Sequence, residues 1–391
     1  MLRKIAFFLI LLWASVHTYA QSFQLSPNAQ ISVLTCGTGE ELYAAFGHTA
    51  IRVQDPAREL DWVYNYGTFN FNTPNFYMKF ARGKLLYSLS KTDFTNFLYT
   101  YQLENRWVKE QILQLKAAEK MELFNFLEEN AKPENKYYKY DFLFDNCATK
   151  IPAVLKMALG DKLVYDSKYL EDSATFRQLI QQHLKANSWS SLGIDLALGA
   201  VIDRKATTLE HTFLPEFVYR QLQNTTLTGA RLVERERVIL DIENTNGGYY
   251  FTTSPLFWLL IFMLFTATIT HIDLKNHARS RWLDFFIFFV TGIAGLLMLF
   301  LWFLTDHSST AYNFNVFWAF PLNCVACFYL FRNGKPSIWL KKYLSVLLIF
   351  LGLTVVFWIS GVQRFAPLVS LILLTLAIRY LFLYHHFNKS A

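Results

Sequence analysis

The chain has 391 residues, 53% of them hydrophobic and 17% aromatic, and it carries a formal net charge of +7. This apolar content is concentrated in the last third of the chain, which excludes a single ordinary soluble domain and predicts a globular domain followed by a membrane domain. Part of the positive charge lies in short loops between the apolar runs, so the net charge does not indicate a nucleic-acid partner.

Residues 1–20 have the pattern of a secretory signal peptide. Arg3 and Lys4 precede a short apolar run, and small residues end at Ala20, after which cleavage is expected. The alternative is that this segment remains as an uncleaved anchor helix. In both cases the domain that follows, residues 21–250, is exported.

The exported domain is expected to have a mixed α+β fold with an antiparallel sheet. Residues 40–46 are expected to form a helical turn. Strand-like patterns predict three strands at 30–35, 48–55 and 59–69, the last two of them paired as a hairpin. Further along, the pattern predicts a helix ended by Pro133, a strand, and a helix ended by Gly160, at 104–133, 136–144 and 148–159.

Residues 251–391 are expected to form an all-α membrane domain of five transmembrane helices. Each apolar stretch is long enough to cross a hydrocarbon core about 30 Å thick. The predicted spans are 255–272, 285–304, 314–331, 343–362 and 366–384. Arg379 lies near the end of the last span, where its side chain is expected to reach the interface.

Loop charges predict the orientation of these spans. The loops after the first and third spans are rich in Lys and Arg, whereas the loop after the second span has neither. Because basic loops stay on the cytoplasmic side, the exported domain should lie outside and the C-terminus inside. The signal peptide predicts the same topology independently.

Cys147 is the candidate nucleophile of the exported domain. It lies at a predicted loop-to-helix junction, where the partial positive charge of a helix N-terminus stabilises a thiolate. A thiolate needs a base, normally a histidine, and His48 is better placed for that role than His183 or His211 because it opens a strand. Asn65, in the neighbouring strand, is the candidate for orienting His48.

Other interpretations of these residues remain open. A histidine at the start of a strand is more often structural than catalytic. Cys36 and Cys147 are both exported, so they are candidates for a disulfide. Cys324 and Cys327 lie in the third predicted span, where they are expected to be small, soft packing residues rather than a redox or zinc site.

The order of His48, Asn65 and the Asn146–Cys147 pair resembles the circularly permuted branch of the papain-like NlpC/P60 superfamily. That branch includes retinol acyltransferase-like thiol enzymes, in which a His opens a strand and an Asn–Cys pair opens a helix. His48 and Cys147 match this pattern directly. Asn65 matches by position, although the retinol-type enzymes have His there.

A closer resemblance covers almost the whole chain, in the ordered blocks TCGTGEELYAAFGHTAIRV, YNYGTFNFNTPNFYMKFARGKLLYSL, ENRWVKEQIL, YDFLFDNCATKI, FLPEF and TDHSSTAYNFNVFWAFPL. These blocks resemble the Lnb-type lipoprotein N-acyltransferases of Bacteroidota. The resemblance implies acyl transfer from a phospholipid to the N-terminal amine of a diacylated lipoprotein, at the periplasmic side of the inner membrane. It implies Cys147 as nucleophile through a thioester, His48 as general base and acid, and no cofactor or metal.

Six further residues are candidates for contact with the substrates. Arg52 and Arg106 have the charge to bind phosphate, with surface ion pairs as the alternative. A polar cluster on the outer side of the spans has side chains suited to a lipid headgroup or an amine, with a solvated loop as the alternative. It comprises Asp306, His307, Asn313 and Asn315.

Two rival functions follow from the same residues. One is a membrane-anchored NlpC/P60-like cysteine peptidase or amidase acting on cell-wall peptides. The other is a non-catalytic membrane scaffold held by a Cys36–Cys147 disulfide. The spans argue mildly against the peptidase, because a soluble or singly anchored hydrolase would reach the cell wall equally well.

Overall fold

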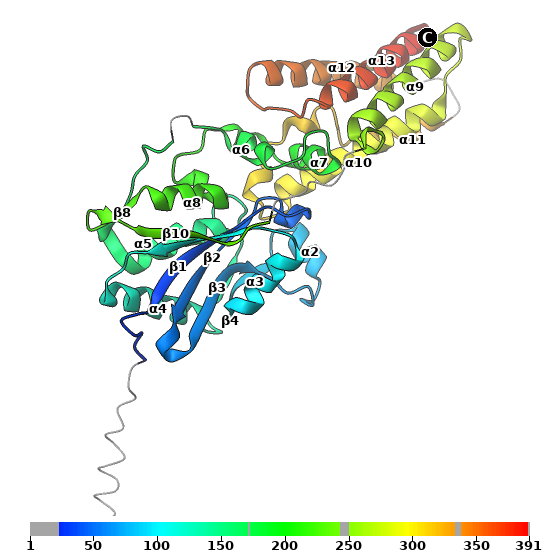
Figure 1. Cartoon of the computed structure of the whole chain (residues 1–391). Helices are drawn as coiled ribbons and strands as arrows, with labels where there is room; N and C mark the ends of the chain where they lie inside the picture. Colours follow the sequence, from blue (N-terminus) through cyan, green and yellow to red (C-terminus); the bar gives the residue numbers. More distant parts are fainter. Residues whose placement is uncertain (1–22, 171–172, 243–249, 333–337, 390–391) are drawn as a thin grey trace, which may run out of the picture.

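The computed structural model describes residues 23–170, 173–242, 250–332 and 338–389. The predicted signal peptide, and nearly all of the stretch around the predicted domain boundary at residue 250, lie outside these residues. Figure 1 shows a sheet-containing domain followed by a helical domain, so the predicted α+β and all-α parts are confirmed in their predicted order.

The first domain is built on a seven-stranded antiparallel sheet with the order β10-β5-β1-β2-β3-β4-β6. The three strands that the sequence pattern predicts most clearly lie at the centre of the sheet. Their side chains alternate between the two faces of the sheet. These strands are β1 (Gln30–Cys36), β2 (His48–Asp55) and β3 (Leu60–Thr68), and the predicted hairpin of β2 and β3 is present. The outer strands are β4 (Leu86–Asp93), β5 (Val108–Leu113), β6 (Tyr137–Lys139) and β10 (Val233–Leu240).

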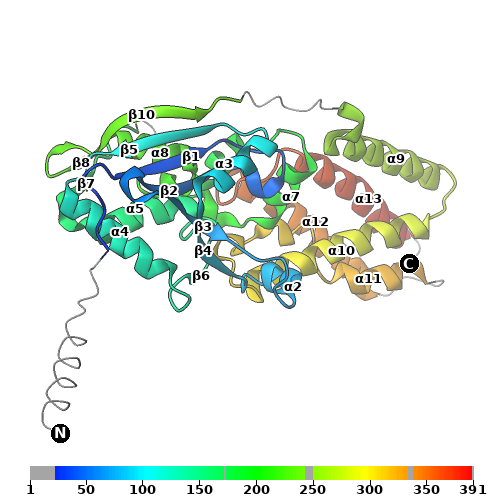
Figure 2. The same ribbon diagram turned by 60° about the horizontal axis from the view of Figure 1, so that its bottom comes forward.

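Helices cover both faces of this sheet (Figures 1 and 2). On one face, Ile51 and Val53 of β2 pack against a layer that contains α4 (Ala117–Ala131), α5 (Cys147–Leu159) and α8 (Pro215–Gln223). On the other face, Ala50 packs against α3 (Phe94–Leu103). Smaller elements complete the domain: α2 (Phe76–Ala81), α6 (Phe176–Gln182), α7 (Trp189–Ala197), and a second sheet of β7 (Leu163–Tyr165), β8 (Thr225–Leu227) and β9 (Ala230–Arg231).

The helix predicted at 104–133 is wrong in its first part. Residues Val108–Leu113 form β5, which pairs with β1 on one side and β10 on the other, and only Ala117–Ala131 is helical. Two strands far away in sequence supply the hydrogen bonds of β5, so tertiary pairing overrides the local helical pattern. The strand predicted at 136–144 is also shorter, because a turn follows Lys139, where the Asp141 carboxylate accepts two backbone N–H groups.

In the described residues, four helices of the membrane domain are each long and apolar enough to span a bilayer on their own. They are α9 (Pro255–Lys275), α10 (Arg281–Phe303), α12 (Ile338–Ile359) and α13 (Val369–Lys389). The third predicted span forms only the nine-residue α11 (Asn323–Phe331). Pro321 has no N–H for a longer helix, the Asn313 side chain donates to the Leu196 carbonyl oxygen in α7, and the Asn315 N–H donates to the Asn313 side chain.

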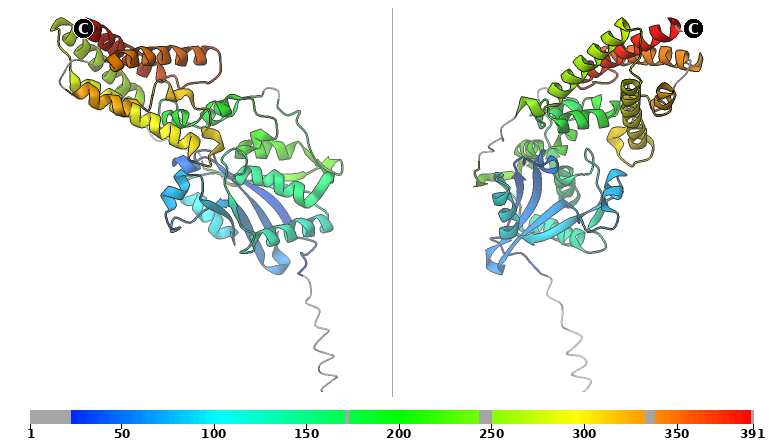
Figure 3. Two further views of the ribbon diagram at one scale, coloured as in Figure 1. Left: turned by 180° about the vertical axis from the view of Figure 1, so that it is seen from behind. Right: turned by 90° about the vertical axis from the view of Figure 1, so that its right-hand side faces the viewer.

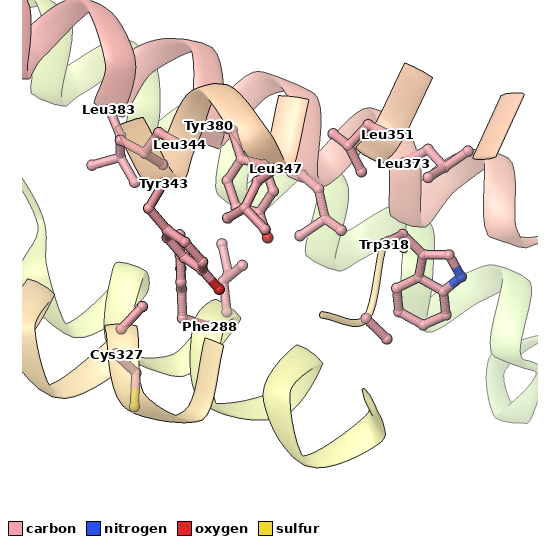
Figure 4. Packing of buried hydrophobic residues seen from close by; sticks show 14 of the residues in the cluster. Phe288, Trp318, Cys327, Tyr343, Leu344, Leu347, Leu351, Leu373, Tyr380 and Leu383 are labelled. Carbon is pink, nitrogen blue, oxygen red and sulfur yellow. The ribbon is translucent and has the colours of Figure 1, made fainter. Parts of the chain in front are cut away.

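Aromatic and aliphatic side chains pack these helices together (Figure 4). Phe288 of α10, Tyr343 and Leu347 of α12, and Tyr380 of α13 lie in one buried cluster. The α11 segment packs beside α10, and Cys327 lies buried in the same cluster as a free thiol. This placement agrees with the packing role expected for Cys327.

Arg379 is buried in an ion-pair cluster between the helices of the membrane domain. Its side chain is 0% exposed and pairs with Asp284 at 2.6 Å and Asp273 at 2.8 Å. The two carboxylates lie just outside the predicted spans, because α9 and α10 are longer than their apolar runs. Arg279 adds a second cation, 3.4 Å from Asp284, so the buried charges balance.

Candidate active site

The turn between β1 and β2 positions His48. Gly47 has a φ of +80°, and a Cβ at this position would lie 2.8 Å from the carbonyl oxygen of Cys36. Only glycine tolerates both the left-handed conformation and the close approach. The next residue, His48, opens β2 opposite Cys36 of β1.

Asn146 fixes the start of α5. Its side-chain oxygen accepts the N–H groups of Ala148 and Thr149, each at 2.8 Å. Its side-chain nitrogen donates to the carbonyl oxygens of Phe142 and Phe213, each at 2.7 Å. An Asn that both caps the helix and joins two loops leaves little freedom to the following residue, which is Cys147.

Cys147, His48 and Asn65 come together where the β2–β3 pairing ends. The last residues paired between these strands are Ile51 and Tyr64. Beyond them, Nε2 of His48 donates to Oδ1 of Asn65 at 2.6 Å, and a side-chain hydrogen bond joins the His48 ring to the Cys147 thiol. Because Nε2 already bonds Asn65, we infer that the other ring nitrogen of His48, Nδ1, makes the hydrogen bond with the Cys147 thiol.

Two neighbouring residues hold Cys147 in this position. The Thr49 hydroxyl donates to the Cys147 carbonyl oxygen at 2.9 Å, which ties the start of α5 to β2. Gly67 has a φ of +85°, and a Cβ there would lie only 3.2 Å from the Cys147 Cβ. Gly67 lies at an irregularity between β3 and β4, so the missing side chain leaves room for the cysteine.

The surroundings favour an ion pair between the thiol and the imidazole. Burial alone would raise the pKa of Cys147, but the charge and hydrogen bond of His48, with the N–H groups of Thr49 and Ala148, lower it overall. Burial alone would lower the pKa of His48, but Cys147 and the Asn65 hydrogen bond raise it overall. One proton passing from sulfur to nitrogen therefore gives a stabilised thiolate–imidazolium pair.

Cys36 differs from Cys147 although the two lie near each other. All four cysteines fall within the described residues, and all four are free thiols, so the proposed Cys36–Cys147 disulfide is not present. Burial raises the pKa of Cys36 to about 12, which makes it a poor nucleophile. The contrast leaves Cys147 as the candidate reactive thiol.

The other two candidate bases are His211 and His183. His211 bonds through Nδ1 to the carbonyl oxygen of Thr207 at 2.7 Å, within its own turn. His183 lies at the end of α6, where burial lowers its pKa. Neither histidine contributes to the interactions of the Cys147 thiol, which leaves His48 as its partner.

The two arginines predicted to bind phosphate have different surroundings. Arg52 pairs with Asp61 at 2.6 Å and Glu110 at 3.2 Å, and its guanidinium lies over the Phe94 ring, which favours a structural role. Arg106 lies closer to the site, since its charge acts on both His48 and Cys36. Its Nε donates to the Gly37 carbonyl at 2.7 Å, while its buried Nη2 has no hydrogen-bond partner.

Two of the cavities in the sheet domain differ in their distance from the site. One, of about 410 Å³, is lined by Cys36, Gly47 and His183 among others. The other, of about 630 Å³, lies at the far end of the sheet, beside Phe23 and Trp62. Cys147 itself is only 8% exposed, so the thiol is largely shielded from water. In the described residues, no three His, Cys, Asp or Glu side chains are grouped so that they could hold a metal ion.

Two family models match the chain. The Lnb N-terminal periplasmic domain matches residues 17–182, and the Lnb transmembrane domain matches residues 246–390. The chain belongs to the Lnb family. No curated protein and no solved structure matches it significantly. Membership indicates a membrane enzyme that modifies lipoproteins, with a periplasmic domain that carries Cys147, His48 and Asn65.

In this Lnb protein the loop at 305–313, which is partly exposed, forms a joint between the domains. Asp306 pairs with Lys139 at 3.3 Å, and its N–H donates to the Arg82 carbonyl at 2.9 Å. The Ser308 hydroxyl donates to the Asp141 carboxylate at 2.5 Å. His307 lies beside Gly83, whose Cβ position is 3.3 Å from the imidazole Cε1. The loop therefore rests against the segment that leads into Cys147.

Asn313, the last residue of the joint, and Asn315, two residues after it, are buried. Asn313 donates to the carbonyl oxygens of Leu196 and Ala197 at the end of α7, and it accepts the side-chain N–H of Asn315 at 2.9 Å. The indole of Trp318 donates to Asn315 at 2.8 Å. These bonds favour a structural role over the predicted contact with a headgroup or amine.

Three residues that touch the site were not singled out from the sequence. Thr49 is the residue after His48, and Gly67 is the glycine of the quoted block that begins YNYG, so both lay within recognised motifs. The Tyr140 ring lies 3.6 Å from the Cβ position of Gly67, beside the nucleophile. Its role depends on a turn between β6 and α5, which no periodic pattern predicts.

Proposed function

We propose that this protein is a lipoprotein N-acyltransferase that moves an acyl chain from a phospholipid to the N-terminal amine of a diacylated lipoprotein through a thioester on Cys147. The observation that carries the proposal is the hydrogen-bonded Cys147–His48 pair at the capped start of α5. Family membership supports the substrate class. No step requires a cofactor or metal.

The first half-reaction uses the ion pair as nucleophile and acid. The Cys147 thiolate attacks the ester carbonyl carbon of the phospholipid, forming a C–S bond and a tetrahedral oxyanion. The positive end of α5 favours that oxyanion. When the C–O bond breaks, His48 gives its proton to the leaving lysophospholipid alcohol, and the acyl chain remains on Cys147 as a thioester.

The second half-reaction reverses the proton movement. The lipoprotein amine attacks the thioester carbonyl, and His48, now neutral, takes the amine proton as the C–N bond forms. The C–S bond then breaks and returns the Cys147 thiolate beside protonated His48. Asn65 keeps Nδ1 of His48 directed toward the sulfur in both steps, because its side-chain oxygen accepts from Nε2 at 2.6 Å and so fixes the orientation of the ring.

Exclusion of water decides between transfer and hydrolysis. A thioester exposed to solvent would be lost to water, which would turn the enzyme into a lipase. Cys147 is 8% exposed, and the Tyr140 ring lies beside it. The shielded position supports acyl transfer over cleavage of soluble cell-wall peptides, which need an open groove.

The proposed topology places the sheet domain in the periplasm, the spans in the inner membrane and the C-terminus in the cytoplasm. The connection between α9 and α10 carries Lys275, Arg279 and Arg281, whereas the joint at 305–313 has no Lys or Arg. The joint then lies on the same side as the sheet domain, with which it forms hydrogen bonds.

The test uses full-length protein in vesicles that contain a phospholipid with isotope-labelled acyl chains. Without acceptor, intact-protein mass spectrometry should find one labelled acyl group on Cys147 of the wild type and none on Cys147→Ala. With a diacylated lipopeptide, labelled triacylated peptide should form. Cys36→Ala is the matched control and should retain both reactions, since Cys36 is buried and protonated.

Two results would overturn the proposal. Labelled lipopeptide formed by Cys147→Ala at the wild-type rate would remove Cys147 from the reaction. Cleavage of muropeptides by the wild type without any acyl-enzyme or triacylated product would favour the cysteine peptidase or amidase instead.

A further inference from the structure

The segment at 69–81, which ends in α2, exposes large apolar side chains. Phe71 is 65% exposed, Tyr77 80%, Met78 60% and Phe80 53%. The membrane domain is present, so these side chains are not covered by it. A contiguous apolar patch of this kind marks a surface that meets an apolar partner.

This patch continues the apolar surface of the membrane domain. At the outer end of α10, Phe303 is 66% exposed and Leu304 is 62% exposed. Two residues further on, the Asp306 N–H donates to the carbonyl oxygen of Arg82, the residue that follows α2. Figures 2 and 3 show the α2 segment on the side of the sheet domain nearest the membrane helices.

The charges beside the patch fit a lipid surface. Lys79, Arg82 and Lys84 lie within or directly after α2. Aromatic side chains flanked by basic ones favour the interface of a bilayer, where rings enter the acyl boundary and cations meet phosphate. A bilayer is therefore a better match for this patch than a protein surface.

A row of aromatic rings leads from the patch to the nucleophile. Ring centroids lie 5.0 Å apart for Phe71–Phe69, 5.3 Å for Phe69–Tyr87 and 4.2 Å for Tyr87–Tyr140. Tyr140 and Cys147 both adjoin the bare Cα of Gly67, whose Cβ position is 3.6 Å from the Tyr140 ring. The row thus joins exposed aromatic residues to the surroundings of the thiol through rings in successive contact.

We propose that residues 69–81 form a lip that enters the outer leaflet, and that a phospholipid acyl chain passes along the rings of Phe69, Tyr87 and Tyr140 to Cys147. This inference rests on the proposed function for its second half, since the chain is delivered for thioester formation. The first half, insertion of the lip, depends only on the exposed side chains and their continuity with α10.

The first experiment tests insertion without chemistry. Full-length Cys147→Ala is placed in nanodiscs that contain a phospholipid with a photoactivatable diazirine near the end of one acyl chain. After irradiation, mass spectrometry should find lipid adducts on peptides covering residues 69–81 and on the spans. The peptide around Met157, which is 61% exposed on α5, is the matched control and should carry none.

Adducts on the spans but none on residues 69–81 would overturn the lip. Equal adduct frequencies on the 69–81 peptides and on the Met157 peptide would also overturn the lip, because the adducts would then report solvent exposure alone. Protection of 69–81 only when a lipopeptide is added would assign the patch to the acceptor protein rather than to the bilayer.

The second experiment tests delivery. In the double variant Tyr77→Glu with Met78→Glu, acyl-enzyme formation from vesicle lipid should fall by about tenfold or more, because charges oppose entry into the acyl region. Alkylation of Cys147 by water-soluble iodoacetamide should stay unchanged, which shows an intact site. The control Val164→Glu, at an exposed position of β7, should leave both rates unchanged.

The two proposals fail in different ways. If the double variant forms acyl-enzyme at the wild-type rate, the proposal that the lip delivers the acyl chain is wrong, while the proposal of a thioester on Cys147 is unaffected. If wild type forms no acyl-enzyme but lipid adducts appear on 69–81, the acyl-transfer proposal fails and the inserted lip stands.

Discussion

Two buried polar clusters, one in each domain, differ in how their side chains come to be charged. In the membrane domain, Arg379 pairs with Asp273 and Asp284 between packed helices. In the periplasmic domain, Cys147 and His48 meet at the end of the sheet. The first cluster is built from groups that normally carry charge at neutral pH, whereas the second acquires charge only when one proton moves within it.

The difference separates a structural cluster from a reactive one. Breaking the Arg379 pairs would leave two buried carboxylates with Arg279 as their remaining cation, so the loss of Arg379 should destabilise the membrane domain. The Cys147–His48 pair exists in a neutral and an ionised form that differ by a short proton transfer. A site that must give up and regain a proton in each catalytic cycle requires a pair like Cys147 and His48, in which the proton can move between two groups.

The largest expected effect tests the reactive cluster. His48→Ala should lower the rate of N-acylation by about 10²–10⁴-fold, the usual contribution of a positioned acid–base group. The rate is measured as triacylated lipopeptide formed in vesicles. His183→Ala is the matched control, because His183 lies in the same domain without contributing to the thiol, and it should retain activity. Equal losses in both variants would contradict the assignment.

The next effect tests the structural cluster. Arg379→Met should lower the free energy of unfolding by about 3–5 kcal/mol, because it leaves Asp273 and Asp284 without their common partner. Unfolding in detergent measures the change, with exposed Arg364→Met as the control. Folded Arg379→Met should still alkylate at Cys147 at the normal rate. Stability equal to that of the control would show that the cluster is not structural.

A pH profile sharpens the comparison further. The lowered pKa of Cys147 keeps the thiolate present below the ordinary thiol range, and it is lost as pH falls through that lowered pKa. The raised pKa of His48 keeps the imidazolium present until pH rises through it. Acyl transfer should therefore show an acid limb from Cys147 and an alkaline limb from His48.

Alkylation by iodoacetamide provides the direct measurement. At pH 7, wild-type Cys147 should react about tenfold or more faster than a free thiol, which is only a few per cent ionised there. In His48→Ala, burial is no longer opposed by the imidazolium, so the reaction should move to alkaline pH. Identical profiles for the two proteins would argue against the ion pair.

The smallest effect concerns Asn65. Asn65→Ala removes one hydrogen bond to His48, so activity should fall roughly fivefold, which corresponds to about 1 kcal/mol. The alkaline limb should move to lower pH, because the Asn65 hydrogen bond raises the pKa of His48. Asn65→Asp keeps an accepting oxygen and adds a negative charge, so its alkaline limb should move to higher pH. An unchanged profile in both variants would leave Asn65 with a packing role.

Local sequence patterns predicted the centre of the sheet and the start of α5. The strand at His48–Asp55 and the helix that Gly160 ends follow from alternation and from helix-ending signals within a few residues. The Asn146–Cys147 junction is equally local, since Asn146 caps the helix through N–H groups two and three residues away. His48, Asn65 and Cys147 could therefore be named before their meeting could be seen.

Features that depend on distant partners could not be predicted in this way. β5 is a strand because β1 and β10 supply its hydrogen bonds. The α-helix of the third apolar run is only the short α11, because the start of the run bonds distant segments: Asn313 donates to Leu196 of α7, and the Phe314 N–H donates to the Gln363 side chain. Arg379 looked like a snorkelling residue because its carboxylate partners lie about a hundred residues away in the chain.

The joint at 305–313 has a geometric consequence. Its bonds to Lys139, Asp141 and the end of α7 fasten the sheet domain to the outer end of the spans at several points. In the proposed topology, the sulfur of Cys147 is then held at one fixed height above the hydrocarbon core. The protein would therefore select its reacting groups by their depth in the membrane. Ester bonds and amines at the height of the sulfur would react, whereas chemically identical groups further out would not.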